Sequence, residues 1–143
     1  MFLGEYRHTL DAKGRVSLPA RFRSAISPQL VVSKGFDGCL YVYTAEEHLA
    51  FLSSIVADDD FDKNRRAVRR FFANGAVEVD LDSAGRVSIL PTLREYAKLT
   101  KDVMVVGNGD RIEIWDAAAY AAYNEQHAGS IEEMAAALAR GVQ

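Results

Sequence analysis

The chain contains only one cysteine and three prolines among its 143 residues. A single cysteine, Cys39, excludes an internal disulfide and is typical of a protein kept in a reducing compartment. No apolar run approaches the roughly 18 residues that a membrane-spanning helix needs, so we expect no membrane segment. The first five residues, Met-Phe-Leu-Gly-Glu, contain no basic region and no apolar stretch, so we expect no signal peptide. Together these absences favour a cytoplasmic protein.

The sequence also lacks the motifs that mark enzymes and metal sites. Its three histidines show no metal-ligand spacing, and the acidic run 58–62 lacks the spaced Asp/Asn pattern and terminal Glu of a calcium loop. Ser17 and Ser88 recur in equivalent places, but no nucleophile elbow surrounds them. No phosphate loop or dinucleotide fingerprint is present. We therefore expect no enzymatic activity, no metal and no cofactor.

Net charge is low, but it is distributed unevenly. The formal charge of −3 by itself argues mildly against nucleic-acid binding. Residues 1–72 contain 11 basic and 9 acidic side chains, whereas residues 73–143 contain 6 and 11. A local positive surface can bind phosphate even when the whole chain is acidic.

The most informative feature that is present is an internal repeat. Residues 4–18, GEYRHTLDAKGRVSL, return 71 residues later as residues 75–89, GAVEVDLDSAGRVSI, with seven of the fifteen positions identical. We predict two homologous units over 4–50 and 75–123, a helical connector over 51–74 and a helical tail over 124–143. Units of this size bury too little surface to be stable alone, so we expect them to share one core.

Each repeat predicts two strands separated by a turn. In the second copy Val77, Val79 and Leu81 alternate with acidic residues, which is the period of a half-buried strand. The following Asp-x-x-Gly is a hairpin turn signal, because Asp accepts local backbone hydrogen bonds and Gly adopts positive φ at little cost. We therefore expect the strands on either side of each turn to pair as a hairpin, with the arginine on the outer face.

Turn and capping signals predict the remaining elements. Thr44 and Ser130 begin capping boxes, Asp116 is a suitable N-cap, and we interpret Asp58–Asp60 as a loop or cap. The predicted elements are helices over 20–26, 44–56, 61–73, 92–99, 116–127 and 130–139, and strand pairs 30–33 with 39–43 and 103–106 with 111–115.

Arg15 and Arg86 are the leading candidates for a binding site. Each directly follows a turn glycine, Gly14 or Gly85. The alternative is that each is an exposed arginine without a binding role, and two copies of the same motif in one chain argue against it. Arginine is suited to forked contacts with phosphate or with guanine O6 and N7.

Asp11 and Asp82 are expected to make the turns or orient the arginines rather than bind a ligand themselves. Lys13 has no counterpart, because Ala84 takes its place. Residues 5–23 contain five basic and two acidic side chains, whereas residues 76–94 contain two and three. The first turn region is therefore positive and the second is negative.

A second basic group lies in the connector at helical spacing. It could be a second DNA-facing stripe, but we favour a solvated face, or one paired with Asp58–Asp62 or with a neighbouring subunit. Its members are Arg65, Arg66, Arg69 and Arg70.

Two stretches resemble a known family over nearly the whole chain. LDAKGRVSLP at 10–19 and LDSAGRVSILPTLR at 81–94, after the opening MFLG, are similar to the MraZ family of bacterial transcriptional regulators. The half-repeat resembles the SpoVT/AbrB domain, in which two hairpin units interlock into a small barrel. The resemblance implies a mainly β, α+β fold of two tandem swapped-hairpin half-barrels from one chain, sharing a pseudo-two-fold core with flanking helices.

The same resemblance implies function and partners. It implies ring-shaped, octamer-like homo-oligomers that bind G-rich direct repeats in double-stranded DNA near their own promoter, in the division and cell-wall gene cluster, and so associate with the nucleoid. Arg15 and Arg86 take the positions of the motif arginines. The main alternative is an antidote-like module that binds a protein, or a purely structural assembly; the short, Ala-rich tail argues against the antidote.

Overall fold

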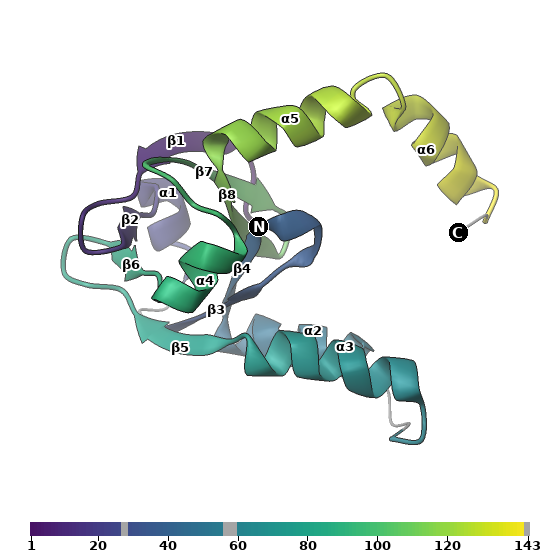
Figure 1. The fold of residues 1–143 in the computed structure, drawn as a ribbon, viewed down its shortest axis with the longest axis horizontal. Helices are drawn as coiled ribbons and strands as arrows, with labels where there is room; N and C mark the ends of the chain where they lie inside the picture. The colour runs from purple at the N-terminus through teal and green to yellow at the C-terminus, as the bar shows by residue number, and fades with distance from the viewer. Residues whose placement is uncertain (27–28, 56–59, 142–143) are drawn as a thin grey trace.

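The computed structural model describes residues 1–26, 29–55 and 60–141. Figure 1 shows an α+β fold in which a curved sheet forms the centre, and helices lie on either side and at one end. The two repeats fold into equivalent sets of elements. Those of the first are β1 (Glu5–Thr9), β2 (Arg15–Ser17), α1 (Ala20–Arg23), β3 (Gln29–Lys34), β4 (Leu40–Thr44) and α2 (Ala45–Ile55).

The second repeat gives the same order after the connector helix α3 (Lys63–Asn74). A short 3-10 turn, η1 (Phe36–Gly38), separates β3 from β4, and α6 (Ile131–Ala139) forms the tail. The elements of the second repeat are β5 (Val77–Asp80), β6 (Arg86–Ser88), α4 (Pro91–Tyr96), β7 (Asp102–Asn108), β8 (Arg111–Asp116) and α5 (Ala117–His127).

The strand order is that of two interlocked halves. The large sheet runs β1-β7-β8-β4-β3-β5, and β2 pairs with β6 in a separate two-stranded ribbon. If each strand is replaced by its equivalent in the other repeat, the same strand order is obtained, read from the opposite edge of the sheet. A pseudo-two-fold axis therefore relates the halves. This is the tandem swapped-hairpin architecture that the family resemblance implied.

The predicted hairpins are wrong beyond their turns. β1 pairs with β7 and β5 pairs with β3, each antiparallel, while β2 and β6 pair with each other. The turn signals were local and correct, but the alternating pattern indicates only which face of a strand is buried. It does not determine which strand lies beside it.

Two apolar clusters lie on opposite faces of the large sheet. The first packs Val16, Leu18, Val87 and Ile89 of the ribbon region against the inner face of the sheet. The second lies under the helices and includes six buried residues: Cys39, Tyr41, Tyr43, Phe72, Val106 and Trp115. Because β4 lies between both clusters, its first four residues are all buried, whereas the edge strands β1 and β5 alternate.

Helix caps agree with the sequence in two of three places. The Thr44 hydroxyl accepts the Glu47 N–H at 3.1 Å, and the Asp116 carboxylate accepts the Ala119 N–H at 3.2 Å. Ser130 occupies the N-cap of α6 but makes no capping hydrogen bond with its side chain, so the predicted capping box is absent. Of the predicted loop or cap at Asp58–Asp60, residues 58 and 59 lie outside the described residues, and the N-cap of α3 is Asp62.

The two short helices end earlier than predicted. α1 ends at Arg23 rather than at 26, and α4 ends at Tyr96 rather than at 99. Lys98 adopts a φ of 51°, a left-handed conformation that a helix cannot contain.

Candidate nucleic-acid interface

The first motif folds into a turn around one aspartate. Oδ1 of Asp11 accepts the backbone N–H groups of Lys13 and Arg15, each at 2.9 Å. Oδ2 of Asp11 accepts the Nε–H of Arg15 at 2.8 Å. Gly14 closes the turn with a φ of 76°, which favours glycine because it has no Cβ.

The second motif repeats this geometry. Oδ1 of Asp82 accepts the N–H groups of Ala84 and Arg86, each at 2.9 Å, and Oδ2 accepts the Arg86 Nε–H at 2.7 Å. Gly85 adopts a φ of 77°. Each aspartate therefore both makes the turn and orients its arginine, which were the two roles expected for it.

These hydrogen bonds lower the pKa of both aspartates. For Asp11 the main cause is the bond from the backbone N–H of Arg15, and for Asp82 it is the bond from the backbone N–H of Arg86. The adjacent guanidinium groups lower the pKa further in each case. The carboxylates therefore stay ionised at neutral pH, and each arginine keeps a charged partner.

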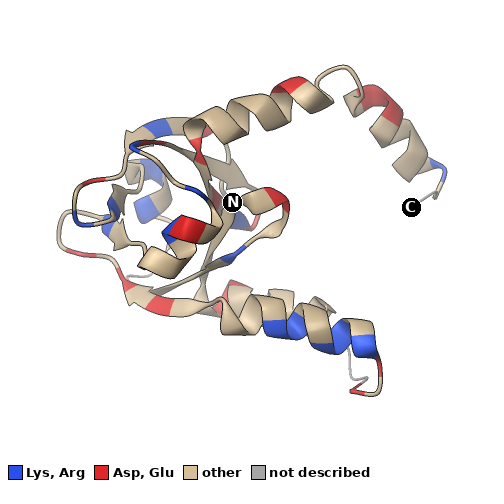
Figure 2. Cartoon of the chain, in the orientation of Figure 1, with Lys and Arg blue, Asp and Glu red and all other residues tan. Residues whose placement is uncertain are grey.

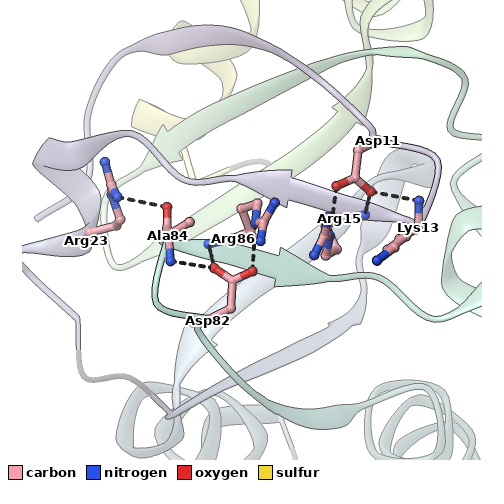
Figure 3. A network of polar contacts seen from close by, with 7 residues as sticks. All are labelled: Asp11, Lys13, Arg15, Arg23, Asp82, Ala84 and Arg86. Atoms are coloured by element: carbon pink, nitrogen blue, oxygen red, sulfur yellow. Dashed lines mark hydrogen bonds and ion pairs between the residues drawn. The ribbon is translucent and has the colours of Figure 1, made fainter.

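The ribbon brings the two motif arginines together. Arg15 is opposite Ser88, Val16 is opposite Val87, and Ser17 is opposite Arg86. Val16 and Val87 are fully buried, so the arginines and serines share the outward face. Residues in this diagonal relation lie about 7–8 Å apart. Figure 3 shows Arg15 and Arg86 side by side along the paired strands.

Each of the two motif arginines forms its ion pair through Nε. Within residues 1–26, 29–55 and 60–141, Arg15 and Arg86 use Nε for their aspartates and make no hydrogen bond through a terminal nitrogen. Their side chains are 25% and 34% exposed. Each arginine is thus held through its Nε, and its two terminal nitrogens can donate hydrogen bonds to another molecule.

Two further arginines lie at the turns and were not predicted as site residues. Nη1 of Arg23 donates to the carbonyl oxygen of Ala84 at 3.2 Å, and Nη1 of Arg94 donates to the carbonyl oxygen of Ile89. A signal was available, because Phe22-Arg23 and Leu93-Arg94 occupy equivalent places in the two repeats. The repeat could not show that each arginine packs against the turn of the other half.

The basic residues of the connector lie elsewhere. Figure 2 shows them along α3, at the end of the molecule opposite the two turns. Arg66 and Arg69 both contact Asp60, through its carbonyl at 2.6 Å and its carboxylate at 2.9 Å respectively. Arg65 lies 3.4 Å from the Asp62 carboxylate. The structure therefore does not bring this stripe together with Arg15 and Arg86. Two of its four arginines, Arg65 and Arg69, form ion pairs with Asp62 and Asp60, which is one of the alternatives that we favoured from the sequence.

Among the described residues no group of three or more His, Cys, Asp or Glu side chains is placed to hold a metal ion. Across that same part of the chain, no helix has the length and apolar character needed to cross a bilayer.

Fold and site together define a class: a tandem-repeat protein in which two interlocked β-rich units present paired, aspartate-oriented arginines on one ribbon. A family model described as "MraZ protein, putative antitoxin-like" matches residues 1–71 and again residues 72–141. The chain belongs to the MraZ family.

Curated relatives match over nearly their full length. The protein named transcriptional regulator MraZ from Heliobacterium modesticaldum is 44% identical over 138 residues, which cover 96% of each chain. Its namesake from Halothermothrix orenii is 41% identical over 138 residues, again 96% of each chain. That from Desulfitobacterium hafniense is 44% identical over 126 residues and 88% of each chain.

Proposed function

We propose that the protein is a transcriptional regulator that binds double-stranded DNA through the outward face of the β2–β6 ribbon. The observation that carries the proposal is the pairing of β2 with β6, which sets Arg15 and Arg86 on one face with Nε of each held by an aspartate. The name transcriptional regulator, which the relatives bear, supports the same function.

A two-stranded ribbon such as β2–β6 is an element that the major groove of DNA can admit. A B-form major groove is about 12 Å wide and admits a two-stranded β-ribbon. Arginine recognises guanine by donating two parallel hydrogen bonds to O6 and N7. With Nε already bonded, each motif arginine retains its terminal nitrogens for such a contact. The arrangement therefore favours G-rich sites, in which two guanines lie within reach of one ribbon.

The glycines and Lys13 contribute in different ways. Gly14 and Gly85 are buried and allow the turn backbone to approach the arginine of the other half. Lys13 is exposed at the tip of the first turn, with its N–H bonded to Asp11. A flexible ammonium at this position suits a phosphate contact, which adds affinity without sequence preference.

We assign the target to short G-rich direct repeats near the chain's own promoter, in the division and cell-wall gene cluster, as the family resemblance implies. Binding there takes place at the nucleoid in the cytoplasm. A single ribbon offers few base contacts, so specific binding requires several ribbons on one assembly.

Self-assembly into a ring is supported by an exposed apolar stripe on the tail. Figure 1 shows α5 and α6 leading away from the sheet. Ile131, Met134 and Leu138 are 56%, 43% and 66% exposed and occupy one side of α6, because they are spaced by three and four residues. Three large apolar side chains on a projecting helix indicate a surface that another protein covers.

A second copy of the chain offers a complementary surface. Glu132 and Glu133 lie beside the apolar stripe on α6, and α3 carries the exposed basic residues Lys63 and Arg70 as well as part of an apolar groove. We assign α6 of one copy to the α3 groove of the next, in a head-to-tail contact that closes into a ring. The groove is lined by Phe36, Ala67, Val68 and Phe71.

A ring would multiply weak contacts. Linked binding gains roughly 10²–10⁴ in overall affinity without new contacts at each ribbon. Repeats spaced by about one helical turn, ~10 bp, would present the same groove face to adjacent subunits. Met134→Glu should disrupt the contact, so we expect smaller particles by light scattering and weaker DNA binding from an unchanged ribbon.

The two motif arginines are not expected to contribute equally. Glu78 and Asp80 are exposed near the second turn, whereas Lys13 lies at the first. Negative charge near Arg86 weakens its attraction for DNA, so Arg15→Ala should reduce affinity more than Arg86→Ala at equal salt. The reverse ranking would contradict this electrostatic argument.

Fluorescence anisotropy tests the proposal. The probes are the chain's own upstream region and a scrambled control, titrated with wild type, Arg15→Ala and Arg86→Ala over a salt series. Arg21→Ala is the matched control, because Arg21 is an exposed arginine outside the ribbon. We expect specific binding in the wild type, clearly weaker specific binding in both ribbon variants, and a change of less than about twofold in the control, since it removes one solvent-exposed charge that salt screens.

Two outcomes would overturn the proposal. If the intact assembly shows no preference over the scrambled probe, a protein-binding or structural role replaces DNA recognition. If the control variant loses as much affinity as the ribbon variants, general charge rather than the ribbon is responsible.

A further inference from the structure

Each motif turn is in contact with an arginine from the other half of the chain. Arg23, the last residue of α1, donates through Nη1 to Ala84 in the second turn, as Figure 3 shows. Arg94, in α4, donates through Nη1 to the carbonyl of Ile89 and lies against Gly14 of the first turn. The two halves therefore exchange arginines across the pseudo-two-fold axis.

The packing at these positions is tight. A Cβ at Gly85 would overlap the guanidinium of Arg23, and a Cβ at Gly14 would overlap that of Arg94. The turns are also bonded across the ribbon: Leu18 N–H donates to the Gly85 carbonyl at 3.0 Å, and Ile89 N–H donates to the Gly14 carbonyl at 2.8 Å. The glycine of each turn is thus the point at which that turn contacts an arginine of the other repeat.

We propose that Arg23 and Arg94 are crossed positioning residues: Arg23 holds the turn that orients Arg86, and Arg94 holds the turn that orients Arg15. This inference rests on the proposed DNA-binding function. It adds two residues to the site and assigns each to the motif that lies farther away in the sequence, 61 residues on for the Arg23 contact with Ala84.

The physical reason is the precision that forked recognition needs. Two parallel hydrogen bonds to a guanine edge require the donor group to be held within about 0.5 Å and 10–20°. The aspartate fixes each motif arginine relative to its own turn, but it does not fix the turn relative to the ribbon. Arg23, bonded to Ala84 and packed on Gly85, supplies that constraint for the second turn. Arg94 packs on Gly14 of the first turn and bonds to the Ile89 carbonyl, and the Ile89 N–H in turn donates to the Gly14 carbonyl.

Hydrogen exchange measured by mass spectrometry tests the positioning directly. The Gly85 N–H bonds to the Asp82 carbonyl at 2.9 Å, and the Gly14 N–H bonds to the Asp11 carbonyl at 3.0 Å, so exchange at each turn reports its opening. Arg23→Ala should accelerate exchange around Gly85 and leave the turn at Gly14 unchanged. Arg94→Ala should do the opposite, and Arg21→Ala should change neither turn.

Double-mutant cycles in DNA binding test the consequence. If Arg23 acts through the second turn, Arg23→Ala should lower DNA affinity only slightly in an Arg86→Ala background. In an Arg15→Ala background it should lower the affinity by its full amount. The crossed pair should show coupling of at least about threefold in the dissociation constant, and the same-half pair none. The Arg94 cycles should show the mirror pattern.

Arg23→Lys separates positioning from direct phosphate binding. Lysine keeps the charge but lacks the planar fork, so positioning predicts weak rescue. A direct phosphate contact predicts rescue by lysine, and a loss of about 0.9 in the salt slope for Arg23→Ala. If Arg23→Ala is too unstable to study, Arg23→Lys can replace it, because lysine keeps the positive charge at position 23.

The outcomes distinguish this inference from the function on which it rests. Wild-type binding by Arg15→Ala and Arg86→Ala would refute the DNA-binding proposal itself. A different result would overturn the crossed arrangement alone: Arg15→Ala and Arg86→Ala weaken binding, but the Arg23 and Arg94 variants affect the turn of their own half or neither turn.

Discussion

Replacement of Gly14 by alanine isolates the contact between the two halves at the first turn. Gly14 has a φ of 76°, and a Cβ there would overlap the guanidinium of Arg94 and lie 3.3 Å from the Ile89 carbonyl oxygen. The Arg94 side chain can move aside, but it then loses its bond to that carbonyl. Two costs should therefore appear together.

The magnitudes follow from each cost separately. A left-handed backbone costs an L-residue about 1–2 kcal/mol. Loss of one hydrogen bond from a half-exposed guanidinium adds about 1 kcal/mol. We expect Gly14→Ala to lower the free energy of unfolding by about 2–3 kcal/mol, which corresponds to roughly 3–4 °C in Tm per kcal/mol for a chain of this length.

A matched control measures the backbone cost alone. Gly109 has a φ of 77° and no heavy atom within 4 Å of an added Cβ, so Gly109→Ala should show the left-handed penalty alone. Melting temperatures are compared at one protein concentration, because the proposed assembly would make Tm concentration-dependent. Adding Arg94→Ala to Gly14→Ala should cost less than Arg94→Ala in the wild type. Equal losses in the two glycine variants would refute the claimed contact.

Three further predictions concern the fold around the site. Asp116→Ala should lower the free energy of urea unfolding by about 2–3 kcal/mol, because its carboxylate caps α5 and accepts hydrogen bonds from Thr100. Ser130→Ala should lower it by under about 0.5 kcal/mol, because the Ser130 side chain makes no capping bond. Similar losses in the two variants would contradict the cap assignment. Folding lowers the pKa of Asp11, so the stability that its carboxylate contributes is present above the ordinary pKa of 3.8 and is lost as pH falls through the folded pKa. Asp11→Asn should therefore flatten the fall of Tm between about pH 5 and about pH 2. An unchanged pH profile of Tm would argue against this role of Asp11. Val87→Ala, at a fully buried position of the ribbon, should cost about 2–3 kcal/mol and lower a single calorimetric transition, because strand pairs join the halves; two separate transitions would contradict a shared core.

Much of the candidate site was readable from local sequence. The Asp-x-x-Gly-Arg spacing places the aspartate four residues before the arginine, so one carboxylate can reach both the turn backbone and the Nε, as Asp11 and Asp82 do. The caps at Thr44 and Asp116 were predictable for the same reason, because each bond spans only three residues.

The local pattern failed where an interaction depends on distant residues. Alternation correctly showed that Val77 and Val79 point inward, but it suggested pairing with β6, whereas β5 pairs with β3. The family resemblance implied interlocked units, and the residues by themselves favoured simple hairpins. Ser130 shows the converse limit, because a capping-box sequence does not ensure that the side chain makes the bond.

By itself, the sequence determined the two turns, the orientation of each motif arginine by its own aspartate, and the buried face of each strand. These features depend on contacts within a few residues, where chain connectivity already holds the partners close. Only the tertiary structure decided that β2 pairs with β6, that Arg15 and Arg86 share one surface, and that Arg23 and Arg94 lie on the opposite halves' turns. Those contacts join residues about one repeat apart, and the burial of a common core, rather than any local preference, selects them.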